Sequence, residues 1–252
     1  MIKPTQINEF VKQNIFPILG NISHNTHITC FTGAGISAES GIQTFRDQGG
    51  LWEQHRIEDV ATPEAFDRNT KKVLQFYNKR RQQLRNVKPG IAHYALADLQ
   101  EKARVQVITQ NVDNLHEKAG SHKVLHLHGE LMKAESSGDK GYIIPLGNKD
   151  IELGDTCPRG FQLRPHVVWF GEMVPNMERA QEMVHHSELL IVVGTSLNVY
   201  PAAGLLHFVQ EGTPIVVIDP QVPELEPFGN VHHIKATASV ALPALVDAIT
   251  DV

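Results

Sequence analysis

The residue of this chain best suited to proton transfer is His128, in the stretch HLHGEL. Its imidazole titrates near neutral pH and Gly129 beside it leaves room for a ligand, so His128 is a candidate general base. The alternation of a short strand puts His126 and His128 on one face, which would also suit a pair of metal ligands. No third or fourth ligand follows at an obvious spacing, which argues against a metal. Judged locally, a lone histidine is more often structural than catalytic.

A second polar group, Gln110, Asn111 and Asp113, directly follows the apolar run VQVIT at 105–109. Asn and Asp are good turn formers, so an ordinary turn would explain them. Open α/β sheets, however, bind ligands where their strands end, which makes these side chains candidates for a site.

The run LLIVVGTS ends in Gly194, Thr195 and Ser196. Small hydroxyls and free amides at a strand end suit a phosphate or a ribose, although a plain turn would look the same.

Tyr77 and Arg80 are three residues apart in an expected helix, so they share a face. Together they would present a hydroxyl and a guanidinium fork, which suits a carboxylate. A solvated arginine on an amphipathic helix is the plainer interpretation.

The glycine turn after ITCFT predicts a dinucleotide. Gly33, Gly35 and Ala38 match G-x-G-x-x-G/A, in which the glycines permit a tight turn and close approach to a pyrophosphate. The pattern is weak alone, and no acidic residue ends a second strand about 20 positions later to bind the ribose. Asp219, at the end of VVIDP, is a candidate for that task.

The elements that must position these residues predict a doubly wound, Rossmann-like parallel α/β sheet. Apolar strands alternate with helices, and each strand ends in a polar or glycine-bearing turn. We expect the dinucleotide-binding domain to comprise residues 1–47, 89–128 and 166–252. The segments 48–88 and 129–165 break the alternation and are expected to form a smaller module, with one or two helices over 63–85 and a loop-rich second half.

Composition limits the class of protein and of partner. The 252 residues are 41% hydrophobic and 20% charged, which is typical of a soluble globular chain. A net charge of −5 without a basic run argues against nucleic acid, and no stretch is apolar enough for a membrane helix or a signal peptide. Only Cys30 and Cys157 are present, so disulfides are not expected and a reducing cytoplasm fits.

Taken in order, these stretches resemble the sirtuins, NAD-dependent protein-lysine deacylases. Six collinear motifs carry the resemblance, from about residue 28 to about residue 246. They are GAGISAESGIQTFRD, TQNVDNLHEKAG, LHLHGEL, RPHVVWFGEMVP, VVGTSLNVYPAA and VVIDPQ. The sequence VLQFYNKRRQQL is similar to the Tyr-x-x-Arg motif of the bacterial branch that removes acidic acyl groups.

The resemblance implies roles for individual residues. His128 would be the general base that acts on the ribose hydroxyls, with Asn111 and Asp113 also catalytic. Tyr77 and Arg80 would bind the acyl group. The acyl-lysine tunnel, whose backbone would pair with the peptide as an added strand, would comprise Val168, Phe170, Gly171 and Glu172. The NAD-binding residues would be Gly33, Ala34, Gly35, Ser37, Phe45, Arg46, Trp52, Gln110, Asn111, Asp113, Gly194, Thr195, Ser196, Asp219, Pro220, Gln221 and Ala238.

The main departure from the family concerns zinc. Sirtuins usually carry two Cys-x-x-Cys pairs between the catalytic histidine and the FGE motif, and here that interval holds only Cys157. One cysteine cannot supply four ligands, so we expect no bound zinc. The module should instead be held by packing of residues such as Tyr142, Ile143, Ile144 and Leu146.

The function this predicts is removal of succinyl, malonyl or acetyl groups from protein lysines, with transfer of the acyl group to ADP-ribose and release of nicotinamide. Two alternatives remain open: ADP-ribosyl transfer or NAD hydrolysis in the same cleft, and a non-catalytic NAD sensor. We expect a cytoplasmic monomer whose partners are NAD and acylated lysines of proteins, not nucleic acid or membrane.

Overall fold

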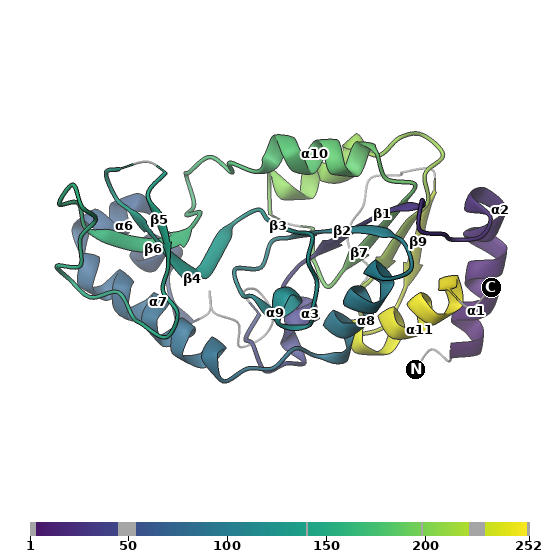
Figure 1. Ribbon diagram of the computed structural model, residues 1–252, viewed down its shortest axis with the longest axis horizontal. Coiled ribbons are helices and arrows are strands. Elements are labelled where there is room, and N and C mark those ends of the chain that lie inside the picture. Colours follow the sequence, from purple (N-terminus) through teal and green to yellow (C-terminus); the bar gives the residue numbers. More distant parts are fainter. Residues whose placement is uncertain (1–3, 45–53, 140, 198, 222–229, 251–252) are drawn as a thin grey trace.

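The computed structural model describes residues 4–44, 54–139, 141–197, 199–221 and 230–250. Its main feature is a six-stranded parallel sheet with the order β3-β2-β1-β7-β8-β9 (Figure 1). The strands are β1 (His27–Thr32), β2 (Arg104–Thr109), β3 (Val124–His126), β7 (Leu189–Val193), β8 (Ile215–Ile218) and β9 (Val231–Ile234). The predicted doubly wound α/β sheet is confirmed.

Helices cover both faces of this sheet because its central strands are apolar on both sides. Every residue of β7 is buried; Leu189 and Ile191 belong to one core, and Leu190 and Val192 to the other. The first core packs against α1 (Pro4–Asn14), α8 (Ile91–Gln100) and α11 (Ala238–Thr250). The second packs against α10 (Met177–His185) and the 3₁₀ helix η1 (Ala202–Phe208). No helix within the described ranges has the length and apolar character needed to cross a membrane.

A smaller module lies at one end of the molecule (Figure 1). It contains a three-stranded antiparallel sheet, β5-β4-β6, made of β4 (Gly129–Ser136), β5 (Ile143–Pro145) and β6 (Leu163–Val167). The helices α5 (Ile57–Val60), α6 (Pro63–Arg68) and α7 (Thr70–Arg85) share a separate hydrophobic core with it. One-turn helices α2 (Phe16–Leu19), α3 (Gly35–Ala38) and α9 (Leu115–Lys118) complete the described elements.

Local signals predicted the helices of this module better than its strands. Thr62 caps α6 by accepting a hydrogen bond from the Ala65 amide, and two helices occupy 63–85 as expected. The interval 133–164 carries three strand segments instead of loops alone, because their antiparallel pairing brings together residues distant in sequence. The expected packing of the side chain of Ile143 is wrong: it is 44% exposed, while Tyr142, Ile144 and Leu146 contact the core.

Two strands of the sheet also differ from expectation. The apolar run 166–170 is only partly a strand, because β6 ends at Val167, and β6 pairs with β4 in the small sheet instead of joining the large one. The edge strand β9 was missed because its sequence, VHHI, is only partly buried and has no apolar run.

The order of the strands reverses at β1, which lies between β2 and β7. The loops after β1 and β7 cross there at very short range. A Cβ atom on Gly35 would lie 2.6 Å from the Cα of Gly194, and one on Gly33 would lie 2.6 Å from the Cβ of Thr195. Gly194 itself has a φ of 59°, which favours glycine. These glycines are therefore required by the contact between the two loops, before any ligand binds.

This contact predicts that Gly35→Ala destabilises the ligand-free protein. The added methyl group meets backbone, so we expect the free energy of unfolding to fall by about 1–3 kcal/mol, measured by urea denaturation without NAD. Gly204→Ala is the matched control, because Gly204 also has an ordinary φ and its Cβ would meet nothing within 4 Å. Equal stability of the two variants would contradict the argument.

Candidate functional site

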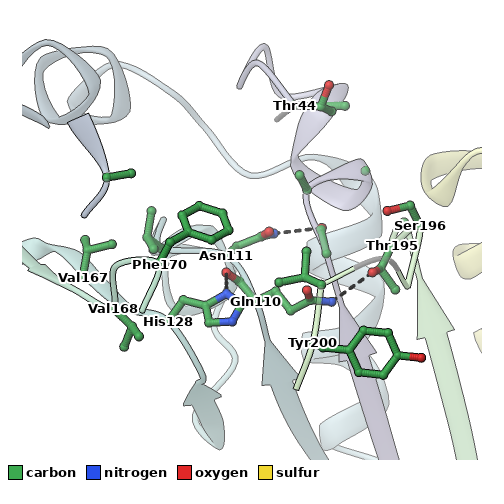
Figure 2. A pocket seen from close by; sticks show the side chains of 18 of the residues that line it. Thr44, Gln110, Asn111, His128, Val167, Val168, Phe170, Thr195, Ser196 and Tyr200 are labelled. Atoms are coloured by element: carbon green, nitrogen blue, oxygen red, sulfur yellow. Dashed lines mark hydrogen bonds between the residues drawn. The ribbon is translucent and has the colours of Figure 1, made fainter. Parts of the chain in front are cut away.

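A cavity of about 790 Å³ lies at the carboxyl ends of the strands, between the large sheet and the small module. Its lining includes most of the residues singled out in the sequence (Figure 2). They are Gly33, Ala34, Gly35, Tyr77, Arg80, Gln110, Asn111, His128, Val168, Phe170, Gly171, Glu172, Gly194, Thr195, Ser196, Asp219, Pro220, Gln221 and Ala238. Three further predicted residues, Phe45, Arg46 and Trp52, lie outside the described part of the chain.

His128 follows β3 and lines the cavity beside Phe170 and Val168 (Figure 2). Its Nδ1 lies 3.0 Å from the carbonyl oxygen of Gln110, which can only accept a hydrogen bond. The proton of the neutral ring is therefore on Nδ1, and Nε2 keeps its lone pair. Burial lowers the pKa of His128 and outweighs the opposing effect of the Gln110 carbonyl. The side chain thus has the tautomer and the charge state of a general base.

Gln110 and Asn111 connect the ends of three adjacent strands. Gln110 Nε2 donates to Thr195 Oγ1 over 2.9 Å, which links β2 to the loop after β7. Asn111 Nδ2 donates to the carbonyl oxygen of Gly33 over 2.9 Å and lies 3.3 Å from Ser37 Oγ, which links β2 to the loop after β1. Both amides are held in position by the sheet itself.

Asp113 and Ser37 lie beside the main cavity. They line a neighbouring cavity of about 30 Å³, which also contacts Ala34, Arg80 and Asn111. The Asp113 carboxylate accepts hydrogen bonds from the Leu115 amide and from Ser37 Oγ, both at 3.0 Å. Burial raises the pKa of Asp113 despite these two donors. Asp113 is thus a buried polar group in the small cavity that adjoins the main one.

Tyr77 and Arg80 reach the main cavity from α7. Trp169 Nε1 donates to the Tyr77 hydroxyl over 3.0 Å, and burial raises the pKa of Tyr77 to about 12, so the hydroxyl keeps its proton at neutral pH. The Arg80 guanidinium lies 5.6 Å from the centre of the Phe76 ring. Burial lowers the pKa of Arg80, and the Tyr77 hydroxyl and Asp113 oppose this effect. An arginine stays protonated under such a shift.

The segment after β6 forms one wall of the cavity and is held internally. The amides of Val168 and Phe170 donate to the carbonyl oxygens of His128 and Ala61 at 2.9 and 3.0 Å. Glu172 accepts hydrogen bonds from two Arg164 nitrogens at 2.6 and 2.9 Å. These contacts set the shape of the wall.

At the opposite end of the cavity, Asp219 follows β8. Its Oδ1 accepts a hydrogen bond from the Gln221 amide over 2.8 Å, and its carbonyl oxygen lies 3.0 Å from His233 Nε2. This turn brings Asp219, Pro220 and Gln221 to the cavity together with Ser196 and Ala238.

Several lining residues were missed by sequence reasoning. Trp169 donates the hydrogen bond to Tyr77, and Thr237 and the exposed Tyr200 also line the cavity. Tyr200, in the expected motif VVGTSLNVYPAA, could have been selected from its place after β7. Trp169 and Thr237 gave no local signal, because an apolar residue or a lone threonine is typical of many positions.

The described residues of the small module do not fit a structural zinc site. Ser136 and Asp139 are spaced i,i+3, as are Cys157 and Gly160, and only one of these four residues is a cysteine. Ser136 Oγ donates to Cys157 Sγ over 3.3 Å and accepts from the Asp139 amide over 2.9 Å. The Asp139 carboxylate instead pairs with Arg159 at 3.0 Å. Among the described residues no group of three or more His, Cys, Asp or Glu side chains could hold a metal.

Comparison with known proteins gives a consistent result. Residues 33–201 match the model of the Sir2 family. An "NAD-dependent protein deacylase" of Bacteroides thetaiotaomicron is 49% identical over 224 residues, which cover 87% of this chain and 96% of that relative. A protein of the same name from Helicobacter pylori (strain J99) is 47% identical over 225 residues, covering 89% and 96%.

Solved structures are similar over the same length. The crystal structure of a Sir2 homologue in complex with NAD has a TM-score of 0.80 at 36% identity and covers 92% of this chain and 97% of its own. A Sir2 complex with a p53 peptide and NAD⁺ has a TM-score of 0.74 at 28% identity, covering 94% and 95%.

Proposed function

The chain belongs to the Sir2 family and is an NAD-dependent protein deacylase, and from this premise we propose that its cavity transfers acyl groups from lysine side chains to ADP-ribose. The observation that supports the proposal most directly is the state of His128, a neutral base on the cavity wall with its Nδ1 proton engaged by Gln110.

The cavity suits NAD in size and in the chemistry of its walls. A volume of about 790 Å³ is within the range of cofactor sites. Gly33 to Gly35 and Gly194 to Ser196 would hold the diphosphate and the adenosine-side ribose, and Asp219 would bind the adenine ribose. Asn111 would contact the nicotinamide ribose, and Asp113 would hold the carboxamide. Ser37, Phe45, Arg46, Trp52, Gln110, Pro220, Gln221 and Ala238 complete the proposed cofactor set.

In the reaction, the acyl oxygen would replace nicotinamide on the ribose carbon of NAD, and one water would then release the lysine amine and leave the acyl group on ADP-ribose. His128 receives a proton from a ribose hydroxyl at Nε2, and the Gln110 carbonyl keeps its ring in the required tautomer. The wall formed by Val168, Phe170 and Gly171 orients the acyl-lysine and excludes water.

We expect His128→Ala to abolish turnover of an acetylated peptide while NAD still binds. Removal of a general base costs on the order of 10²–10⁴-fold in rate. Peptide turnover is followed by mass spectrometry, nicotinamide release by chromatography and NAD affinity by calorimetry. Nicotinamide release by the wild type without any acyl peptide would instead favour ADP-ribosyl transfer or NAD hydrolysis, and NAD binding without turnover would favour a sensor.

The acyl group that this cavity favours is, we propose, an acidic one such as succinyl or malonyl. The Tyr77 hydroxyl and the Arg80 guanidinium reach the same cavity as His128, and a carboxylate is the natural partner of a guanidinium in a water-poor site. Trp169 holds the Tyr77 hydroxyl by its indole N–H, which leaves the hydroxyl proton for the ligand. Deacetylation is the second activity.

Arg80→Met tests this preference. The variant should lose about 10-fold or more of kcat/KM for a succinyl peptide, since a charge-assisted hydrogen bond contributes about 1.5–3 kcal/mol, and much less for the acetyl peptide of the same sequence. Lys79→Met is the control, because Lys79 is the exposed neighbour of Arg80 on α7. Equal losses on both peptides would refute the acyl assignment of Arg80.

We also propose that segments 48–88 and 129–165 act as one module held without zinc. Its apolar core joins α7 to the small sheet, and buried Arg81 links them through a hydrogen bond from its Nε to the Leu131 carbonyl over 3.0 Å. Asn78 reaches across to Ile151, donating to its carbonyl oxygen and accepting from its amide.

Metal analysis of the purified protein checks this. We expect far less than one equivalent of zinc per chain. The melting temperature should be the same with and without a chelator, because Cys157 is the only cysteine of the module. A stoichiometric metal content, or a melting temperature that drops on chelation, would show that the module does depend on zinc. We further propose that the enzyme works as a monomer in a reducing cytoplasm, where its buried thiols Cys30 and Cys157 stay unpaired.

A further inference from the structure

The two histidines of HLHG have opposite hydrogen-bonding environments. His128 faces one acceptor, the Gln110 carbonyl. Buried His126 faces two: its Nδ1 lies 2.9 Å from the Asn111 carbonyl oxygen, and its Nε2 lies 2.8 Å from Glu117 Oε1. A backbone carbonyl can only accept a hydrogen bond, and a carboxylate oxygen accepts one as well. Both ring nitrogens of His126 therefore need a proton, which only the imidazolium provides.

The charges around His126 favour the same state. Glu117 faces it from α9, Glu130 from β4 and Asp113 from the turn after β2. His116 on α9 also interacts with His126, but burial lowers the pKa of His116 well below its usual value, so that ring is neutral and adds no opposing charge. Burial by itself lowers the pKa of His126, but the Glu117 hydrogen bond and charge, the Asn111 carbonyl and Glu130 together raise it above the ordinary value.

His126 is connected to the site through the main chain of Asn111. The carbonyl of Asn111 is held by the His126 ring, while the side chain of Asn111 reaches the Gly33 carbonyl. The backbone of His126 is in turn anchored from α10, since Asn176 Nδ2 donates to its carbonyl oxygen over 2.8 Å. Asn176 is the N-cap residue of α10, but its side chain makes no capping hydrogen bond and makes this contact instead. A shift of the His126 ring would therefore move Asn111 directly.

We propose that His126 is a positioning residue that works only as an imidazolium, fixing Asn111 against the cofactor by its paired contacts with the Asn111 carbonyl and Glu117. This rests on the proposed deacylase function for its kinetic consequence. Catalysis then requires two opposite protonation states two residues apart: His128 neutral and His126 charged. The rate should rise with pH as His128 loses its proton and fall at higher pH as His126 loses its own, which gives a bell-shaped profile.

The protonation state is tested directly by ¹⁵N nuclear magnetic resonance of the histidine rings in the full-length protein. At pH 7 the His126 ring, assigned by its absence in His126→Asn, should show both nitrogens protonated, and the His128 ring should show one. This readout does not depend on activity. A neutral His126 ring at pH 7 would overturn the proposal, whereas a wild-type protein without peptide turnover would refute the proposed function alone.

Three variants test the kinetic role. Glu117→Gln removes the paired charge, so the alkaline limb of kcat/KM should move to lower pH by about one unit while the acid limb stays in place. His126→Asn keeps a donor close to the position of Nδ1 but does not titrate, so it should remain active and lose the alkaline limb. His126→Leu removes both contacts and should lower kcat by on the order of 10–100-fold.

Glu9→Gln, which neutralises an exposed carboxylate of α1, is the control and should leave the profile unchanged. An alkaline limb that neither Glu117→Gln nor His126→Asn alters would show that His126 is only a structural contact. If His126→Leu does not fold, the other two variants and the ring spectra still decide the question.

Discussion

The crossing of two loops over the carboxyl end of the sheet is the constraint on which the rest of this structure depends. Gly33 and Gly35 after β1 lie so close to Gly194 after β7 that a single added methyl group would overlap backbone atoms. Because β1 and β7 flank the point where the strand order reverses, this contact brings the ends of the central strands to one place. The cavity forms at these strand ends.

The polar side chains of the cavity are fixed by the same crossing. Gln110 bonds to Thr195 in one loop and Asn111 to Gly33 in the other, so the turn after β2 is positioned by both. The main-chain carbonyls of Gln110 and Asn111 then select different states for two nearby histidines. His128 is held as a neutral tautomer by one carbonyl, and His126 is held as a cation by the other together with Glu117. The two consecutive carbonyl groups of Gln110 and Asn111 thereby determine the protonation states of both histidines.

The small module completes the cavity, and its described residues pack around a hydrophobic core of their own. Its apolar core and the buried Arg81 join α7 to the small sheet. Ser136 also makes a hydrogen bond to Cys157. The same α7 presents Tyr77 and Arg80 to the cavity. The packing of this core therefore fixes where the side chains of Tyr77 and Arg80 lie in the cavity.

The sequence by itself determined the fold class and most of the cavity lining, because apolar strands that end in glycine and polar turns are local patterns. Spacing alone left His128 and the pair Tyr77 and Arg80 as candidates beside plainer structural interpretations, and the family resemblance selected them; all three line the cavity. The sequence did not determine the strands of the small module, the edge strand β9 or the role of Trp169, since each depends on a partner far along the chain. Above all, the difference between His126 and His128 is invisible in HLHG. Only the tertiary structure decides it, because the charge of an imidazole follows from how many acceptors surround its two nitrogens.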